Sequence, residues 1–128
     1  MNLLLDTHAL IWWGLDDPRL GPSARTMIAS ADNQVFVSAA SAMEVATKHR
    51  LGKLPEAERL AREFAALVEG LGFLPLPISL AHAQFAGNLV VPHKDPFDRL
   101  LIAQSILEPM PLVSNEAIFD DFGVSRIW

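Results

Sequence analysis

The sequence predicts a single-domain α/β protein, residues 1–128, in which a central, mostly parallel sheet of four or five strands is flanked by helices. Three observations predict this fold. Short apolar or β-rich runs typical of strands recur along the chain, at residues 3–5, 34–38, 73–77, 111–114 and 124–127. Segments with helical start and stop signals separate them, and such alternation implies crossover connections between parallel strands. The chain has 128 residues, 51% of them apolar, which is enough for one domain with its own core.

The first strand, residues 3–5, is a continuous apolar run, which predicts burial on both faces of the sheet. A short helix over residues 8–13 follows, with Asp6 or Thr7 at its start. It ends at Asp16-Asp17-Pro18, because a residue that precedes proline avoids helical geometry. A second helix covers residues 21–31 and leads into the second strand.

The middle of the chain carries two further helices and an edge strand. Ser41 opens the third helix as the first residue of a capping box that Glu44 completes, and the helix stops at Gly52. Pro55 starts the fourth helix, which ends near residues 70–72. The prolines in the third strand then indicate the edge of a sheet, because proline cannot donate to a ladder.

The last third of the chain contains two longer helices and two short strands. Ser79 begins a helix that ends near Leu89, and Asp95 caps a helix with Pro96 at its first position that continues through Leu107. A short helix at residues 116–121 separates the last two strands.

Composition excludes several classes of protein. The net charge of −5 argues against binding nucleic acid through bulk positive charge, although it leaves room for an enzyme that meets RNA at a local site. There is no cysteine, so disulfides, thiolate metal sites and cysteine nucleophiles are excluded, which suits the cytoplasm where we expect the protein. No signal peptide, membrane span or membrane partner is predicted.

Four carboxylates stand out by their context: Asp6, Glu44 and Glu116 follow predicted strands, and Asp98 lies in the first turn of the helix that follows residues 92–94. In a parallel sheet these points share one edge, so the four side chains are expected to converge. Converging carboxylates repel one another, and a hard divalent cation such as Mg²⁺, with Mn²⁺ as the alternative, relieves the repulsion. The chemistry indicated is hydrolysis of a phosphodiester by a metal-activated water.

Each acid also has a simpler interpretation. Asp6 and Glu116 suit helix N-termini, and Glu44 suits a capping box and a pair with Lys48 four residues on. Asp98 suits the same helix start as Asp95, which directly precedes Pro96 and is expected to be a cap rather than a ligand.

Four segments together resemble the motifs of the PIN-domain family, and most closely its VapC-type toxins, the ribonuclease halves of bacterial toxin–antitoxin pairs. They are residues 3–10, 37–46, 93–104 and 112–116, in that order, so the resemblance spans the chain. It implies a Mg²⁺- or Mn²⁺-dependent endoribonuclease with a single PIN-like domain. It also implies three kinds of partner: an RNA substrate, a cognate antitoxin, and a second copy in a homodimer that forms a larger hetero-oligomer with the antitoxin.

The resemblance assigns site residues by position. Asp6, Glu44 and Asp98 match the core acids, and Glu116 falls on a fourth position that is often aspartate, so it assists. Asp95 belongs to the same signature as Asp98 and is expected to be a helix cap, with contact to the metal as the lesser alternative. The residues that resemble the family's orienting polar groups are Thr7, Ser114 and Asn115.

The remaining polar and aromatic residues have two interpretations each. Lys48, in the basic segment 48–53, is the best candidate for an RNA-backbone contact, and a solvated helix face is the alternative. Arg99 either balances the charge of Asp98 or touches RNA, and His93 either meets substrate phosphate or lies in a solvated loop. Trp12 and Trp13 point about 100° apart on a helix, so one should be in the core and the other on a partner surface.

Two rival functions remain. A haloacid-dehalogenase-like phosphatase also uses an aspartate after its first strand, but that family usually places a second aspartate two residues later, where this chain has His8. The other rival is a non-catalytic partner-binding α/β domain whose acids only cap helices.

Overall fold

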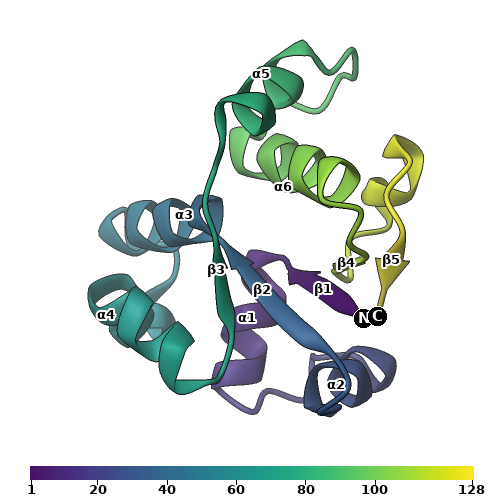
Figure 1. Ribbon diagram of the computed structural model, residues 1–128. Coiled ribbons are helices and arrows are strands. Elements are labelled where there is room, and N and C mark those ends of the chain that lie inside the picture. Colours follow the sequence, from purple (N-terminus) through teal and green to yellow (C-terminus); the bar gives the residue numbers. More distant parts are fainter.

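The computed structural model describes residues 1–128 and contains a five-stranded sheet in the order β3-β2-β1-β4-β5 (Figure 1). Every neighbouring pair of strands is parallel, and Leu5 of β1 lies beside Val37 of β2 and Val113 of β4. The predicted parallel α/β architecture is therefore confirmed. The strands are β1 (Asn2–Leu5), β2 (Gln34–Ser38), β3 (Leu74–Leu76), β4 (Leu112–Val113) and β5 (Arg126–Ile127).

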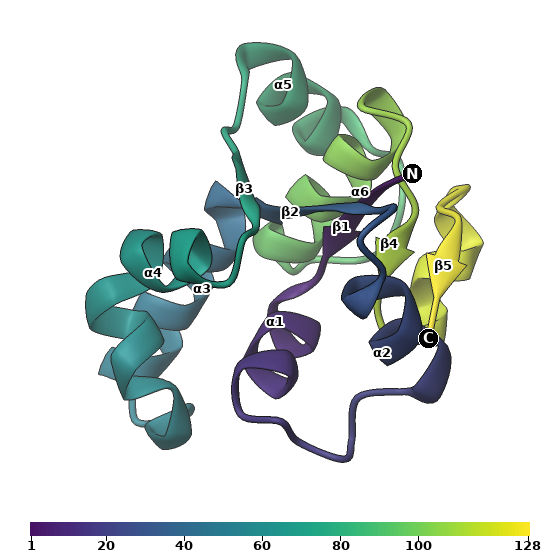
Figure 2. The ribbon, with the colours of Figure 1, turned by 60° about the horizontal axis from the view of Figure 1, so that its bottom comes forward.

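Helices connect the strands and cover both faces of the sheet (Figure 2). None of them combines the length and the apolar character that crossing a bilayer would take. The α-helices are α1 (Thr7–Gly14), α2 (Pro22–Ala29), α3 (Ala39–Arg50), α4 (Glu58–Gly70), α5 (Leu80–Asn88) and α6 (Pro96–Leu107), and two 3₁₀ helices are η1 (Pro55–Ala57) and η2 (Ala117–Phe122).

Alternation along β1 divides the interior into two cores. Leu3 and Leu5 point into the larger core, which they share with buried residues of α1 to α4. Leu4 points to the opposite face and packs with Leu101 and Ile102 of α6. The three leucines are fully buried, so the central strand is covered on both sides, as its continuous apolar run predicts.

Two helix starts differ from the prediction. Helix α3 begins three residues earlier than expected, because Ser38 rather than Ser41 is its cap and accepts a hydrogen bond from the Ala40 N–H at 2.9 Å. Glu44 therefore lies beyond the first turn and is not part of a capping box. The segment expected as one helix from Pro55 divides into η1 and α4, and α4 itself is interrupted by a non-helical Glu63.

The tryptophan pair also differs from the prediction. Trp12 is buried in the larger core, as expected of one of the two. Trp13 does not form an exposed partner surface, since it is only partly exposed and packs on Phe73, with ring centroids 6.3 Å apart.

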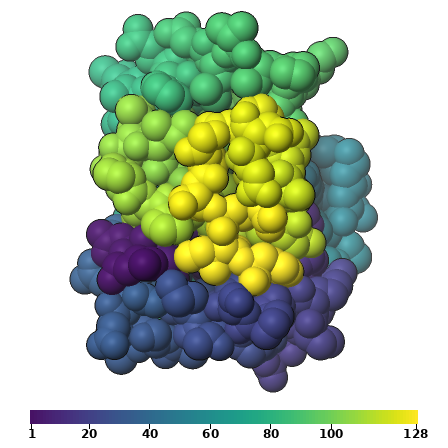
Figure 3. Space-filling model, turned by 90° about the vertical axis from the view of Figure 1, so that its right-hand side faces the viewer, coloured from purple at the N-terminus to yellow at the C-terminus, as the bar shows by residue number.

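The C-terminal segment closes the molecule beside the N-terminal residues (Figure 3). The Trp128 ring meets the Trp12 ring edge-on, with centroids 5.7 Å apart, and it leaves no room for a side chain at Gly21. A Cβ at Gly21 would lie 2.8 Å from the Trp128 carbonyl carbon. The chain end is thus packed into the structure by aromatic contact.

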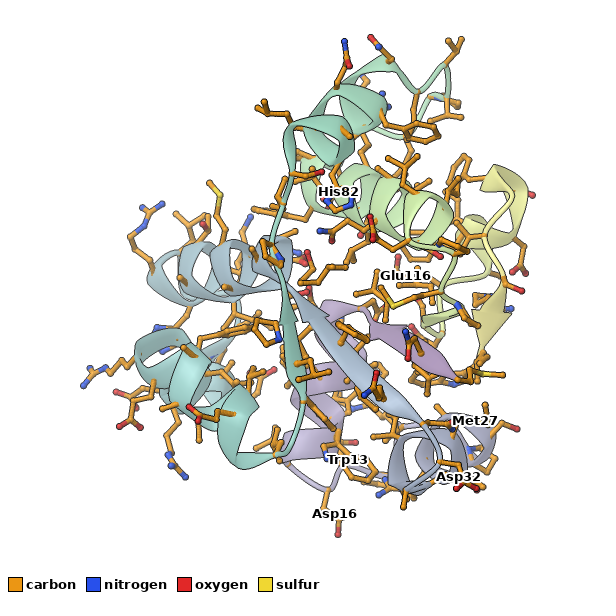
Figure 4. All side chains as sticks on the ribbon, viewed as in Figure 1. Trp13, Asp16, Met27, Asp32, His82 and Glu116 are labelled. Carbon is orange, nitrogen blue, oxygen red and sulfur yellow. The ribbon has the colours of Figure 1, made fainter.

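Helix α5 is fastened to α6 by a buried histidine that points from one helix to the other (Figure 4). His82 Nδ1 accepts a hydrogen bond from the Ser79 N–H at 3.0 Å, which closes a capping box at the start of α5. His82 Nε2 lies 2.9 Å from Glu108 Oε2, beyond the end of α6. This interface positions the loop between α5 and α6, which leads to the acidic site.

Candidate active site

Three of the four predicted acids lie on segments that follow strands, and the fourth lies at the start of α6. Asp6 follows β1 directly, Glu44 lies on α3 after β2, and Glu116 follows β4 and precedes η2. Asp98 lies in the first turn of α6. The negative charges of Glu116 and Asp98 raise the pKa of Asp6, and those of Glu116 and Glu44 raise the pKa of Asp98, so the four acids share one electrostatic environment.

Asp6 is deeply buried, with 4% of its surface exposed. Its Oδ1 caps α1 by accepting the Ala9 N–H at 2.8 Å. Burial raises the pKa of Asp6 to about 7, although hydrogen bonds from Ser114 and the Ala9 backbone act in the opposite direction. Asp6 is therefore both a cap and a carboxylate under electrostatic stress.

Glu44 is equally buried and is held from two sides. One carboxylate oxygen accepts a hydrogen bond from the Thr7 hydroxyl, and the other pairs with the Lys48 ammonium, the predicted partner one turn along α3. Thr7 Oγ1 also lies 3.0 Å from Ser41 Oγ. Since Thr7 has a single O–H, it donates to Glu44 and accepts from Ser41. Thr7 thus orients the acid, as the sequence predicts.

Asp98 is partly buried and contacts a histidine from the preceding loop. His93 Nε2 lies 2.7 Å from Asp98 Oδ2. Burial raises the pKa of Asp98 to about 6, the His93 contact lowers it, and the charges of Asp95, Glu116 and Glu44 raise it further. His93 is a site residue that the sequence left undecided, because nothing in the spacing of residues 93 and 98 shows which way the loop turns.

Asp95 is the N-cap of α6, as predicted. Its Oδ1 accepts hydrogen bonds from the Phe97 N–H at 2.8 Å and from the Asp98 N–H at 3.1 Å. These bonds satisfy two amide groups that the first turn of a helix leaves without partners. Asp95 therefore fixes the start of the helix that carries Asp98.

Ser114, Asn115 and Glu116 directly follow β4 and form the last part of the site. Glu116 is half-buried and lies beside α6 (Figure 4), and its backbone N–H donates to Ser114 Oγ at 3.0 Å. The buried Ser114 side chain also hydrogen-bonds Asp6, so it links the first and last acids of the chain. Asn115 is exposed.

The donor set fits a hard divalent cation, although the side chains do not stand in a ligand arrangement. No three acidic or imidazole groups are placed to hold one metal ion. Lys48 and His93 instead pair with Glu44 and Asp98. The site nevertheless consists of carboxylate oxygens whose negative charge is destabilised by burial and mutual repulsion, and a hard divalent cation would relieve that cost.

Arg99, predicted either to balance the charge of Asp98 or to touch RNA, contacts the backbone of the preceding loop instead of the Asp98 carboxylate. All five N–H donors of its guanidinium are directed at backbone carbonyls of residues 86–93, so none remains for a phosphate. Lys48, the other predicted RNA contact, forms an ion pair with Glu44 in the structure. Sequence spacing could not reveal the role of Arg99, because it depends on the path of a loop.

Known proteins resemble the chain in sequence and in fold. The model of the family described as "PIN domain" matches residues 3–124. Ribonuclease VapC16 of Mycobacterium tuberculosis is 38% identical over 69 residues, which are 51% of this chain and 49% of that protein. The chain thus matches only about half the length of this curated relative.

Solved structures share the fold over nearly the whole chain. VapC20 of M. tuberculosis, described as a sarcin-ricin loop cleaving toxin, superposes with a TM-score of 0.69 at 16% identity and covers 98% of both chains. VapBC2 of Rickettsia felis, bound to a DNA fragment from its promoter, gives a TM-score of 0.68 at 15% identity over 99% of this chain and 98% of that one. A toxin–antitoxin complex from Klebsiella pneumoniae gives 0.68 at 18% identity, over 98% and 96%.

Proposed function

The chain belongs to the PIN-domain family, and from that premise we propose that it is a metal-dependent endoribonuclease that hydrolyses RNA phosphodiester bonds. One observation carries the proposal: burial raises the pKa of Asp6 and of Asp98, and the charges of Glu116 and of other members of the acid set raise both further. Helix caps scattered over the surface would show neither effect. The relative named a ribonuclease supports the same reaction.

In the proposed mechanism, Asp6, Glu44 and Asp98 hold Mg²⁺ or Mn²⁺, with Glu116 assisting. When bound, such an ion polarises a phosphoryl oxygen and makes a water more acidic. The chain's own residues position the acids: Thr7 orients Glu44, and Ser114 hydrogen-bonds Asp6. His93 holds Asp98 from the loop side. Lys48 and His93, which pair with Glu44 and Asp98, would have to give up or share these two carboxylates for them to hold a cation.

The proposed biological role is that of the toxin in a toxin–antitoxin pair. Three similar structures carry the names of such toxins or complexes. The antitoxin is expected to place a basic residue among Asp6, Glu44 and Asp98, an arginine in preference to a lysine, because a planar guanidinium bonds two carboxylate oxygens at once. The active unit is expected to be a homodimer that forms a larger complex with the antitoxin.

The proposal is tested by exchanging Asp6 for asparagine. Asp6→Asn keeps the size and the capping oxygen but removes the charge, so it should weaken Mn²⁺ binding and reduce RNA cleavage about 100-fold or more. Calorimetric titration with Mn²⁺ and cleavage of a labelled RNA measure the two effects. Asp32→Asn, at an exposed acid far from the site in sequence, is the matched control. Cleavage by Asp6→Asn at the wild-type rate would rule out this site.

The same titration separates the rival functions. A partner-binding domain whose acids only cap helices would bind no Mn²⁺ and cut no RNA. A phosphatase would bind the cation but release inorganic phosphate from phosphomonoesters, and it would leave internal RNA bonds intact.

A further inference from the structure

The loop between α5 and α6, residues 89–95, carries His93 to Asp98 and has almost no regular structure of its own. Three backbone carbonyls of this loop and two of the last turn of α5 accept hydrogen bonds from a single side chain. Arg99 Nε donates to Ala86 O at 3.0 Å, and Arg99 Nη2 donates to Gly87 O at 3.3 Å and to Leu89 O at 2.7 Å. Arg99 Nη1 donates to Val91 O at 3.4 Å and to His93 O at 2.9 Å.

These bonds join two structural elements through one guanidinium. Two of the five carbonyls, from Ala86 and Gly87, belong to the last turn of α5, where the helix leaves carbonyls without partners and favours positive charge. The other three follow the loop as far as His93. Arg99 itself is on the first turn of α6, one residue after Asp98, so it ties the end of one helix and the whole loop to the helix that bears the acid.

The contact at the end of the loop lies at the acidic site. The His93 backbone is held by Arg99, and its ring lies 2.7 Å from Asp98 Oδ2 through Nε2. The other side of the ring faces Phe122, with centroids 6.0 Å apart. His93 is therefore fixed at its backbone and at its ring, and its hydrogen bond fixes the rotamer of Asp98.

We propose that Arg99 is a positioning residue: it holds the loop so that His93 orients the Asp98 carboxylate, and it does not contact RNA. The inference rests on the proposed function for its kinetic test but not for its structural test. Arginine is needed rather than lysine, because five donors in a rigid planar fork reach five carbonyls and a lysine ammonium has only three donors on one atom.

The structural test compares wild type with Arg99→Lys, which keeps the charge. Amides of residues 87–94 should exchange hydrogen faster in the variant, while those of β1 and β2 keep their protection. The His93 ring resonances should shift at constant pH, because the ring loses its fixed place beside Asp98. Arg62→Lys is the control, since Arg62 is exposed on α4 and pairs only with Glu58. Unchanged loop exchange and unchanged His93 resonances would overturn the proposal.

The kinetic test separates positioning from direct RNA contact. Arg99→Lys should lower kcat about 10- to 100-fold with little change in KM, as is typical when a group that orients a site ligand is lost. A raised KM with unchanged kcat would show instead that Arg99 binds the RNA backbone. His93→Ala should lower kcat similarly, and the double variant should be no worse than His93→Ala alone. Additive losses would contradict a role that acts through His93.

A measurement on wild type keeps the proposal testable if Arg99→Lys does not fold. The Arg99 side-chain N–H resonances should exchange slowly and should show hydrogen-bond couplings to the carbonyl carbons of Ala86 and His93. Rapid exchange without such couplings would overturn it. If wild type cuts no RNA with any divalent cation, the proposed function fails, while the resonances and the exchange data still decide the role of Arg99.

Discussion

At the scale of single residues, the acids of the site are held by ion pairs and hydrogen bonds with neighbouring side chains. The sequence singled out the four carboxylates by context: Asp6, Glu44 and Glu116 follow strands of a parallel sheet, and Asp98 lies in the first turn of α6. It also located the Glu44–Lys48 pair, which depends only on helical spacing. It could not locate the partners of Asp98 and Arg99, because loop paths leave no periodic signal in a sequence.

The raised pKa of Asp6 makes the stability of the metal-free protein depend on pH. The pKa is about 7 in the folded chain, against an ordinary value of 3.8 for an aspartate side chain. The folded state therefore binds the proton more tightly, so the contribution of Asp6 to the free energy of unfolding is largest below about pH 4 and falls as the pH rises toward 7. Asp6→Asn should remove this part of the pH dependence, leave the part due to Asp98, and be more stable than wild type at pH 7.5 by a few kcal/mol at most.

Urea unfolding in EDTA, at intervals between pH 4 and pH 8, checks this expectation. Asp32→Asn should reproduce the wild-type dependence on pH. Parallel curves for wild type and Asp6→Asn would show that Asp6 is ionised in the folded protein without cost.

Removing the Lys48 ammonium should change stability and metal binding in opposite directions. Lys48→Met keeps most of the side-chain volume but leaves the buried Glu44 without its cation, which should cost about 1–3 kcal/mol of metal-free stability. Mn²⁺ no longer competes with the ammonium for that carboxylate, so its affinity should rise. Denaturant titration and calorimetry measure the two effects. Weaker Mn²⁺ binding would mean that Lys48 helps to shape the site rather than to neutralise it.

At the scale of elements, helix starts decide which side chains reach the site. Serines at positions 38 and 41 both suit an N-cap, and the choice of Ser38 moves Glu44 from a capping position to one that faces Thr7. The sequence could not distinguish the two, because the end of β2 decides between them. The start of α6 was predictable, since Asp95 and Pro96 leave little choice of register.

The two aspartates at the start of α6 should therefore respond differently to the same substitution. Asp95→Asn should keep most RNA cleavage and lose only a few tenths of a kcal/mol, because asparagine caps nearly as well as aspartate. Asp98→Asn should lose cleavage, because it removes a charge from the acid cluster. Side-by-side cleavage assays and thermal unfolding test both statements. Loss of cleavage in Asp95→Asn alone would identify Asp95 as the metal ligand instead.

At the scale of the whole molecule, the two ends of the chain are packed together. The contact between Trp128 and Gly21 was not predictable, because the absence of a side chain at residue 21 matters only once the final residue lies against it. Trp12, on α1, also packs against the Trp128 ring, so an N-terminal helix contacts the last residue.

Gly21→Ala should destabilise the protein although its backbone conformation is ordinary. The new Cβ would meet the Trp128 backbone at 2.8 Å, so the C-terminal segment must shift, at a cost of about 1–3 kcal/mol. Gly14→Ala is the matched control, because nothing lies within 4 Å of its Cβ position and the change should be neutral or stabilising. Chemical denaturation of both variants measures the difference, and equal stabilities would show that the C-terminal segment yields without cost.

The strand order has a consequence for synthesis on the ribosome. Strand β1 leaves the ribosome first, yet one of its two neighbours is β4, so the edge at Leu4 and Leu5 stays open until Leu112 and Val113 emerge. An unpaired apolar edge of this kind is prone to aggregate during that interval. The neighbours of Asp6 at the site include Ser114 and Glu116, so a nascent chain that ends before these residues lacks part of the acidic cluster.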